Sequence, residues 1–173
     1  MTIPRPQDTE YPSFYAGYVG KVPASGPVAL LDAQKPAFET LRGMNDAAGN
    51  SRYADGKWTV KELVGHVADA ERVFAYRLLR IARGDQTPLS GFDENAWAVT
   101  APHGHRTLKD LADEMLAIRA ATMALMHSLD AAAIAHAGTA NGKPVTARAL
   151  CWILPGHAQH HLDILRERYG VAL

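Results

Sequence analysis

Three histidines lie within five positions of one another near the C-terminus, in GHAQHHLDILRERYG (residues 156–170). Imidazole nitrogens bind divalent metal ions, and imidazoles also transfer protons near neutral pH. With about 100° between successive residues of a helix, His157 and His161 fall on the apolar stripe one turn apart, while His160 lies to its side. This i, i+4 spacing allows two imidazoles to reach one ion.

A pair of histidines at this spacing is by itself a weak metal signal. An imidazole on an apolar helix face is more often a hydrogen-bonded core residue. The pair also differs from the zinc-protease motif H-E-x-x-H, because Ala158 stands where that motif has its glutamate. A metal site therefore needs a further ligand from elsewhere in the chain.

The stretch from Thr59 to about Arg83 offers such a ligand. His66 flanks the apolar stripe of this stretch, where it can face another helix across a groove. Together with His157 and His161 it would complete a set of three imidazoles. The stripe itself consists of Val60, Leu63, Val64, Val67, Phe74, Leu78 and Ile81.

Two acidic residues on the same stretch are candidates for a catalytic base or for a hydrogen-bond partner of a metal ligand. Asp69 follows His66 by three residues. Glu71 falls inside the apolar stripe, where an apolar residue is expected. We favour a buried ion pair of Glu71 with an arginine such as Arg77 or Arg148, and a catalytic role is the alternative.

Four long stretches with helical periodicity must position these side chains. The first spans about Pro27 to Asp46, and Pro36 interrupts it. The others have recognisable ends: a capping box at Thr59 and Glu62, a cap at Thr107, and a C-terminal stop at Gly170. The sequence therefore predicts an all-α four-helix bundle, with helices over about 27–46, 59–83, 108–129 and 146–168. The segment DENAWA predicts a short extra helix, and TANGKPVT predicts a small hairpin.

The positions of the histidines along their helices predict how these helices run. His66 lies seven residues after the start of the second helix, and His161 lies seven residues before the end of the fourth. The two are level only if these helices are antiparallel. A plain up-down-up-down bundle would make them parallel. The long connection of residues 84–106 allows a crossover between the second and third helices, and the shared ion favours it.

Composition limits the class of protein. The 173 residues indicate a single domain spanning 1–173, and 18 basic residues balance 18 acidic ones. This balance argues against nucleic acid as a partner. No stretch is long and apolar enough for a membrane span, the N-terminus is not a signal peptide, and Cys151 is the sole cysteine. We therefore expect a cytoplasmic protein without a membrane partner.

The chain resembles the DinB-like superfamily, and most closely its YfiT-like branch. The resemblance covers nearly the whole chain. It rests on KWTVKELVGHVADAERVFAYRLLRIARGDQTPLSGFDENAWA, GTANGKPVTARAL and GHAQHHLDILRERYG, and most specifically on the pattern W-[ST]-x-K-E-x-x-x-H followed by H-x-x-x-H. The resemblance implies a four-helix bundle with a divalent ion, nickel or zinc, held by His66, His157 and His161. Pro155 is a feature that the family pattern does not explain.

The resemblance also implies the kind of activity. Members of the superfamily are described as metal-dependent hydrolases or as transferases acting on low-molecular-weight thiols, and many are homodimers. Three protein ligands leave an open position on the ion, as in catalytic sites. We expect a hydrolase that activates water for attack on a small-molecule substrate. The alternatives are a metal-dependent transferase using a low-molecular-weight thiol, and a non-enzymatic metal-binding stress or interaction module.

Overall fold

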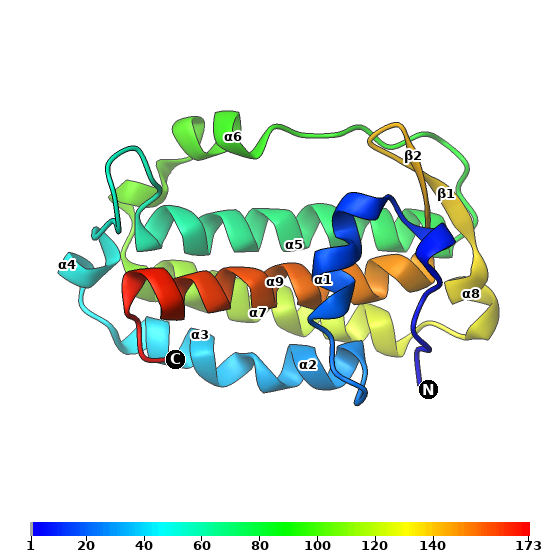
Figure 1. The fold of residues 1–173 in the computed structure, drawn as a ribbon, viewed down its shortest axis with the longest axis horizontal. Helices are drawn as coiled ribbons and strands as arrows, with labels where there is room; N and C mark the ends of the chain where they lie inside the picture. Colours follow the sequence, from blue (N-terminus) through cyan, green and yellow to red (C-terminus); the bar gives the residue numbers. More distant parts are fainter. Residues whose placement is uncertain (1) are drawn as a thin grey trace.

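Helices make up most of residues 2–173, which the computed structural model describes (Figure 1). The four long helical stretches form a four-helix bundle: α2 and α3 together, α5, α7 and α9. The elements are η1 (Asp8–Glu10), η2 (Ser13–Tyr15), α1 (Ala16–Gly20), α2 (Pro27–Ala33), α3 (Lys35–Gly43), α4 (Asp46–Gly49), α5 (Val60–Ala82), α6 (Glu94–Thr100), η3 (Pro102–His105), α7 (Leu108–His127), α8 (Ala131–Ala135), β1 (Ala137–Ala140), β2 (Lys143–Thr146) and α9 (Ala147–Tyr169).

The long helices begin and end where the sequence predicts. Thr59 and Glu62 form the capping box of α5. The hydroxyls of Thr107 and Thr146 accept backbone N–H groups in the first turns of α7 and α9. Gly170 adopts φ 67°, a left-handed conformation that glycine tolerates at a helix end. The predicted short helix and hairpin are confirmed as α6 and as β1–β2.

The first helical stretch is divided into two helices. α2 ends at Ala33 and α3 starts at Lys35, with Gln34 between them and Pro36 in the first turn of α3. Proline has no N–H to donate, so it fits the first turn of a new helix and disfavours a continuous one. The predicted interruption is confirmed.

The direction of the helices confirms the crossover. Asp46 pairs with Lys61 at the start of α5 and accepts the backbone N–H of Leu108 at the start of α7, so both helices begin at the same end of the bundle. At that end the Tyr169 hydroxyl, on the last residue of α9, donates to the Trp58 carbonyl at 2.6 Å. α9 therefore runs antiparallel to α5. The connection between α5 and α7 returns along the length of the bundle and contains α6 (Figure 1).

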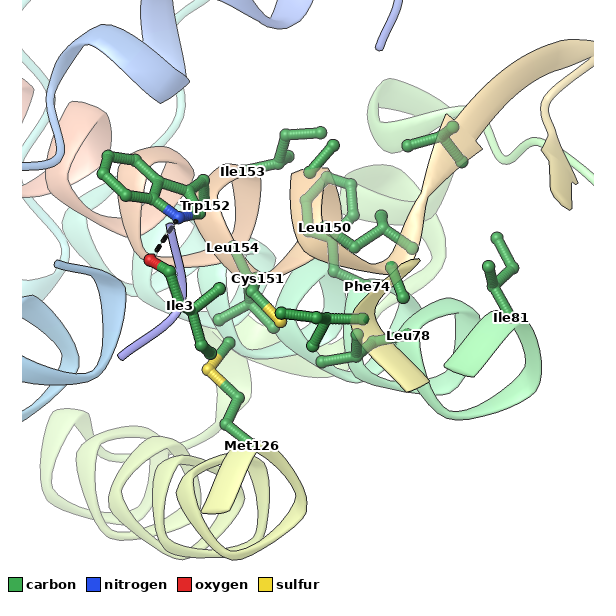
Figure 2. Close-up of a cluster of buried hydrophobic side chains, with 14 of the residues drawn as sticks. Ile3, Phe74, Leu78, Ile81, Met126, Leu150, Cys151, Trp152, Ile153 and Leu154 are labelled. Carbon is green, nitrogen blue, oxygen red and sulfur yellow. Dashed lines mark hydrogen bonds between the residues drawn. The ribbon is translucent and has the colours of Figure 1, made fainter. Parts of the chain in front are cut away.

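The apolar core is built mainly from the facing sides of α5, α7 and α9. Figure 2 shows one part of it, where Phe74, Leu78 and Ile81 of α5 lie near the start of α9 and Met126 of α7. Here the Trp152 indole donates to the backbone carbonyl of Ile3 at 3.3 Å, which fastens the N-terminal segment to α9. A second cluster packs the other end of the bundle around residues of α3, α5, α7 and α9.

A buried polar network joins the four parts of the bundle. Arg119 of α7, fully buried, pairs with Glu71 of α5 at 2.8 Å. Its Nη1 also donates to Gln34 Oε1 between α2 and α3, at 2.9 Å. The Gln34 amide in turn donates to the carbonyl of Pro155 in α9, at 2.9 Å. Because each link crosses to another helix, the network fixes the helices relative to one another. α9 continues through Pro155 without a break.

Across residues 2–173, none of the helices combines the length and the apolar character that a membrane crossing requires.

Candidate metal centre

Three histidine side chains from two helices converge on one point. His66 comes from α5, and His157 and His161 come from α9. The Nε2 atom of His157 lies 3.2 Å from Nε2 of His66 and 3.1 Å from Nε2 of His161. All three side chains are buried, with 6–9% of their surface exposed. The structure thus brings together the three histidines singled out in the sequence, while His160 stays outside this group.

The arrangement has the geometry of a metal site. Ligand nitrogens about 2.05 Å from one ion lie about 3.3 Å apart at a tetrahedral angle and about 2.9 Å apart at a right angle. The two Nε2 separations of 3.1 and 3.2 Å fall between these values. Hydrogen bonds cannot satisfy all three nitrogens, because Nε2 of a neutral imidazole has either one hydrogen or one lone pair. The central His157 can therefore satisfy one neighbour, whereas an ion would satisfy all three.

Burial keeps these imidazoles neutral. It lowers the pKa of His66 to about 4 and the pKa of His161 to about 2. The pKa of His157 is also lowered well below its usual value, by burial first and then by the neighbouring histidines. Neutral imidazoles have a free lone pair, and metal binding requires that form.

Aromatic rings hold the histidines in place. The Trp58 ring lies 4.8 Å from the His66 ring, and the rings of Tyr18 and Phe74 lie edge-on to His157 at 5.3 and 5.5 Å. The contact with Tyr18 depends on Gly156, since a Cβ there would lie 2.0 Å from the Tyr18 carbonyl oxygen. The Nδ1 atom of His161 is buried and has no hydrogen-bond partner within residues 2–173, so ring packing orients this side chain.

The three histidines lie in the wall of an open pocket of about 460 Å³. This volume is in the usual range for small-molecule sites. Two charged side chains share the pocket, the Glu94 carboxylate from α6 and the Arg77 guanidinium from α5. Its wall consists of Phe14, Tyr15, Tyr18, Trp58, His66, Phe74, Arg77, Phe92, Glu94, Asn141, His157 and His161.

Asp69 lies close to this pocket, but its carboxylate already has a hydrogen-bond partner, His103. Its carboxylate lies 3.3 Å from Nε2 of His103. The hydrogen bond from His103 is the largest effect on the pKa of Asp69 and lowers it. His103 belongs to the 84–106 connection, yet it is buried: the residue is 7% exposed, and its ring packs on Gly65, where a Cβ would lie 2.4 Å from the ring.

Glu71 forms the buried ion pair that the sequence favours, but with a different arginine. The predicted partners, Arg77 and Arg148, are wrong. Glu71 binds Arg119, and Arg148 binds Glu10. Since Arg119 belongs to α7, sequence spacing along α5 could not identify it. Glu71 is 2% exposed and does not line the histidine pocket, so its position fits the network between helices.

The sequence does not indicate that Glu94 and Arg77 line the pocket. It places Glu94 in the short helix of DENAWA, at the start of α6. Helical periodicity within α5 or α9 cannot show that α6 lies near the histidines. The 84–106 connection brings α6 there, because it folds back along the bundle. The sequence suggests Arg77 solely as a partner of Glu71.

Comparison with known proteins agrees with the fold and with the kind of site. The sequence profile of the DinB superfamily matches residues 29–165. Two curated relatives, from Oceanobacillus iheyensis and Geobacillus thermodenitrificans, are each named "Putative metal-dependent hydrolase". They are 34% identical over 62 residues and 38% identical over 72 residues, and these alignments cover 35% and 42% of this chain. The chain spans about 35–39% of the length of these relatives.

Two solved structures share the fold. YfiT from Bacillus subtilis, described as "a probable metal-dependent hydrolase with an unusual four-helix bundle topology", has a TM-score of 0.71 at 19% identity, over 98% of this chain and 95% of its own. A mycothiol-dependent maleylpyruvate isomerase has a TM-score of 0.67 at 17% identity, over 89% of this chain and 63% of its own. The match of the family profile to most of the chain shows that this protein belongs to the DinB superfamily.

Proposed function

We propose that the protein is a metal-dependent hydrolase whose ion is held by His66, His157 and His161. The observation that carries this proposal is the convergence of three buried, neutral imidazole nitrogens in the wall of an open pocket. Three protein ligands leave room for water or substrate, as in catalytic zinc sites. When bound, a divalent ion supplies a Lewis acid that polarises a carbonyl or phosphoryl oxygen and acidifies a bound water.

Three imidazoles limit the choice of ion. Nitrogen ligands suit nickel and zinc, whereas magnesium and calcium prefer oxygen ligands. We therefore propose nickel or zinc as the native metal.

Glu94 is the side chain best placed to accept a proton. It lines the same pocket as the three histidines, and no ion pair holds it within residues 2–173. Asp69 is the weaker candidate, because its hydrogen bond with His103 stabilises the ionised form and lowers its basicity. We propose Glu94 as the general base and Asp69 as the residue that positions His103.

A thiol-dependent reaction is the second candidate. It is favoured by the fold shared with a mycothiol-dependent isomerase and by a pocket large enough for a low-molecular-weight thiol beside a substrate. The thiol would have to come from outside the protein. Cys151 is buried, and burial raises the pKa of its thiol to about 12, so it cannot supply a thiolate near neutral pH.

One screen separates the two candidates. Metal-loaded protein is offered esters and amides, and separately electrophiles such as epoxides, each with and without added low-molecular-weight thiols. Turnover that needs no thiol and disappears in His157→Ala supports the hydrolase. Conjugation that strictly requires a thiol supports the transferase. Absence of turnover in every arm, with the ion fully bound, would contradict both and favour a non-enzymatic metal-binding module.

A further inference from the structure

One cation in the pocket has no partner of opposite charge. Arg77 of α5 is 3% exposed and lines the same pocket as the three histidines. Within residues 2–173, no carboxylate oxygen lies within 4.0 Å of its guanidinium. Its Nη2 donates to the Ser90 carbonyl at 2.7 Å, and the Tyr15 hydroxyl is a further hydrogen-bond partner. A guanidinium has five N–H donors, so these two contacts leave most of its donors without an acceptor among residues 2–173.

The surroundings of Arg77 are apolar. Its Cζ atom lies 5.9 Å from the centre of the Phe74 ring and 5.9 Å from the centre of the Phe92 ring. Tyr15 is the other close neighbour: burial raises the pKa of its hydroxyl, and the charge of Arg77 and its hydrogen bond with that hydroxyl oppose the rise. Aromatic faces stabilise a guanidinium only in part. A buried cation in such a place is costly unless an anion joins it.

The second buried arginine of the protein provides a contrast. Arg119 lies at a contact between helices, and protein acceptors take up most of its donors: the Glu71 carboxylate, the Leu31 carbonyl and Gln34. Arg77 lacks such a set, and it faces a cavity. The fold therefore satisfies its structural arginine internally and leaves the pocket arginine available to a ligand.

The distance from Arg77 to the histidines suits one small molecule. The Phe74 ring is near both, 5.9 Å from Arg77 Cζ and 5.5 Å from the centre of the His157 ring, so at most about 11.4 Å separates guanidinium and imidazole. From these observations we propose that Arg77 binds a carboxylate of the substrate, whose apolar body lies along Phe74 and Phe92 and presents its reactive group to the three histidines. This proposal rests on the proposed function and names its substrate class: carboxylate-bearing molecules with an apolar or aromatic body.

Arginine suits this task because its planar donors match both oxygens of a carboxylate. Glu94 in the same pocket adds selectivity, because it would repel a second negative charge near the histidines. The preferred ligand therefore carries one carboxylate, at the end that faces Arg77.

The test compares two probes of nearly identical shape. Isothermal titration calorimetry measures binding of 3-phenylpropionate and of its neutral amide, 3-phenylpropionamide, to the metal-loaded protein. We expect the carboxylate to bind at least about tenfold more tightly, the equivalent of about 1.4 kcal/mol. Arg77→Met should reduce this ratio to about one, and Arg77→Lys should retain part of it. Arg80 lies on the same helix as Arg77, and its charge is paired with Asp85. Arg80→Gln should therefore leave the ratio unchanged.

Other outcomes would overturn the proposal. One is a wild-type protein that does not distinguish the probes. Another is a folded Arg77→Met variant, with wild-type circular dichroism, that keeps the preference. A third is a preference that survives in Arg77→Met and disappears after chelation of the metal, since the carboxylate would then bind the ion. Metal content is measured separately in each sample, and chelated wild-type protein should keep the preference. Failure of the metal site is thereby distinguished from failure of the arginine site.

Discussion

His66 and His157 are separated by 91 positions in the chain, yet their Nε2 atoms lie 3.2 Å apart. This contact joins α5 to α9, and it forms because the two helices run antiparallel. His161, one turn further along α9, reaches the same point, with its Nε2 atom 3.1 Å from that of His157. Within residues 2–173, these are the side chains whose arrangement supports a metal centre.

Removal of any one of the three histidines should abolish stable metal binding. His66→Ala, His157→Ala and His161→Ala each leave two imidazoles for the ion. Metal analysis of purified variants by mass spectrometry measures this, and we expect one divalent ion per chain in the wild type. His160→Ala is the matched control, because His160 is a neighbour on the same helix but lies outside the cluster. Full occupancy in any of the first three variants would remove that residue from the ligand set.

Replacement of Glu94 should slow the reaction without loss of metal. Glu94→Gln keeps the size of the side chain and removes the base, so we expect kcat to fall by about 10²–10⁴-fold, the usual contribution of a general base. Glu167→Gln changes an exposed residue of α9 and should have no effect. Asp69→Asn should have a smaller effect than Glu94→Gln. If Asp69→Asn proves the more damaging substitution, the two roles are reversed.

Loss of Arg119 should destabilise the fold. Arg119→Met leaves Glu71 buried without a partner and breaks the links of α7 to Gln34 and Leu31. Breaking a buried pair in this way costs about 3–5 kcal/mol in the free energy of unfolding, measured by urea denaturation. Arg166→Met is the control, since it removes an exposed pair with Asp163 that is worth about 0–1 kcal/mol. Equal effects of the two substitutions would contradict a structural role for the network.

The metal-free protein should lose stability as the pH falls from about 7 toward 4. Burial lowers the pKa of His66 to about 4 and that of His161 to about 2 in the folded state. The unfolded chain takes up protons at these histidines near pH 6.5, and the folded chain does not. Acid therefore favours the unfolded state until the folded protein is protonated as well.

Urea denaturation at several pH values measures this dependence. His161→Asn should show a weaker loss of stability with acid, because it removes one of the buried groups. His127→Gln, at the end of α7, should keep the wild-type dependence. A stability that is constant between pH 7 and 5 in the chelated wild type would show that these histidines are not shielded from protons.

The sequence by itself determined the helices and the candidate ligands. Local signals act over three or four residues, as at the capping box of Thr59 and Glu62, and they do not depend on the rest of the fold. The level positions of His66 and His161 also predicted the crossover, because a shared ion requires both histidines at the same height in the bundle. The helix bounds and the antiparallel arrangement of α5 and α9 confirm these predictions.

The tertiary structure alone decided which charges meet. Helical periodicity placed Glu71 on a buried face, but no pattern along α5 could show that Arg119 of α7 lies opposite. His103 became buried and Glu94 reached the pocket because the connection between α5 and α7 folds back over the bundle. Such contacts depend on how far each helix is shifted and rotated against its neighbours. That arrangement is fixed by packing of the whole core, and no short stretch of sequence encodes it.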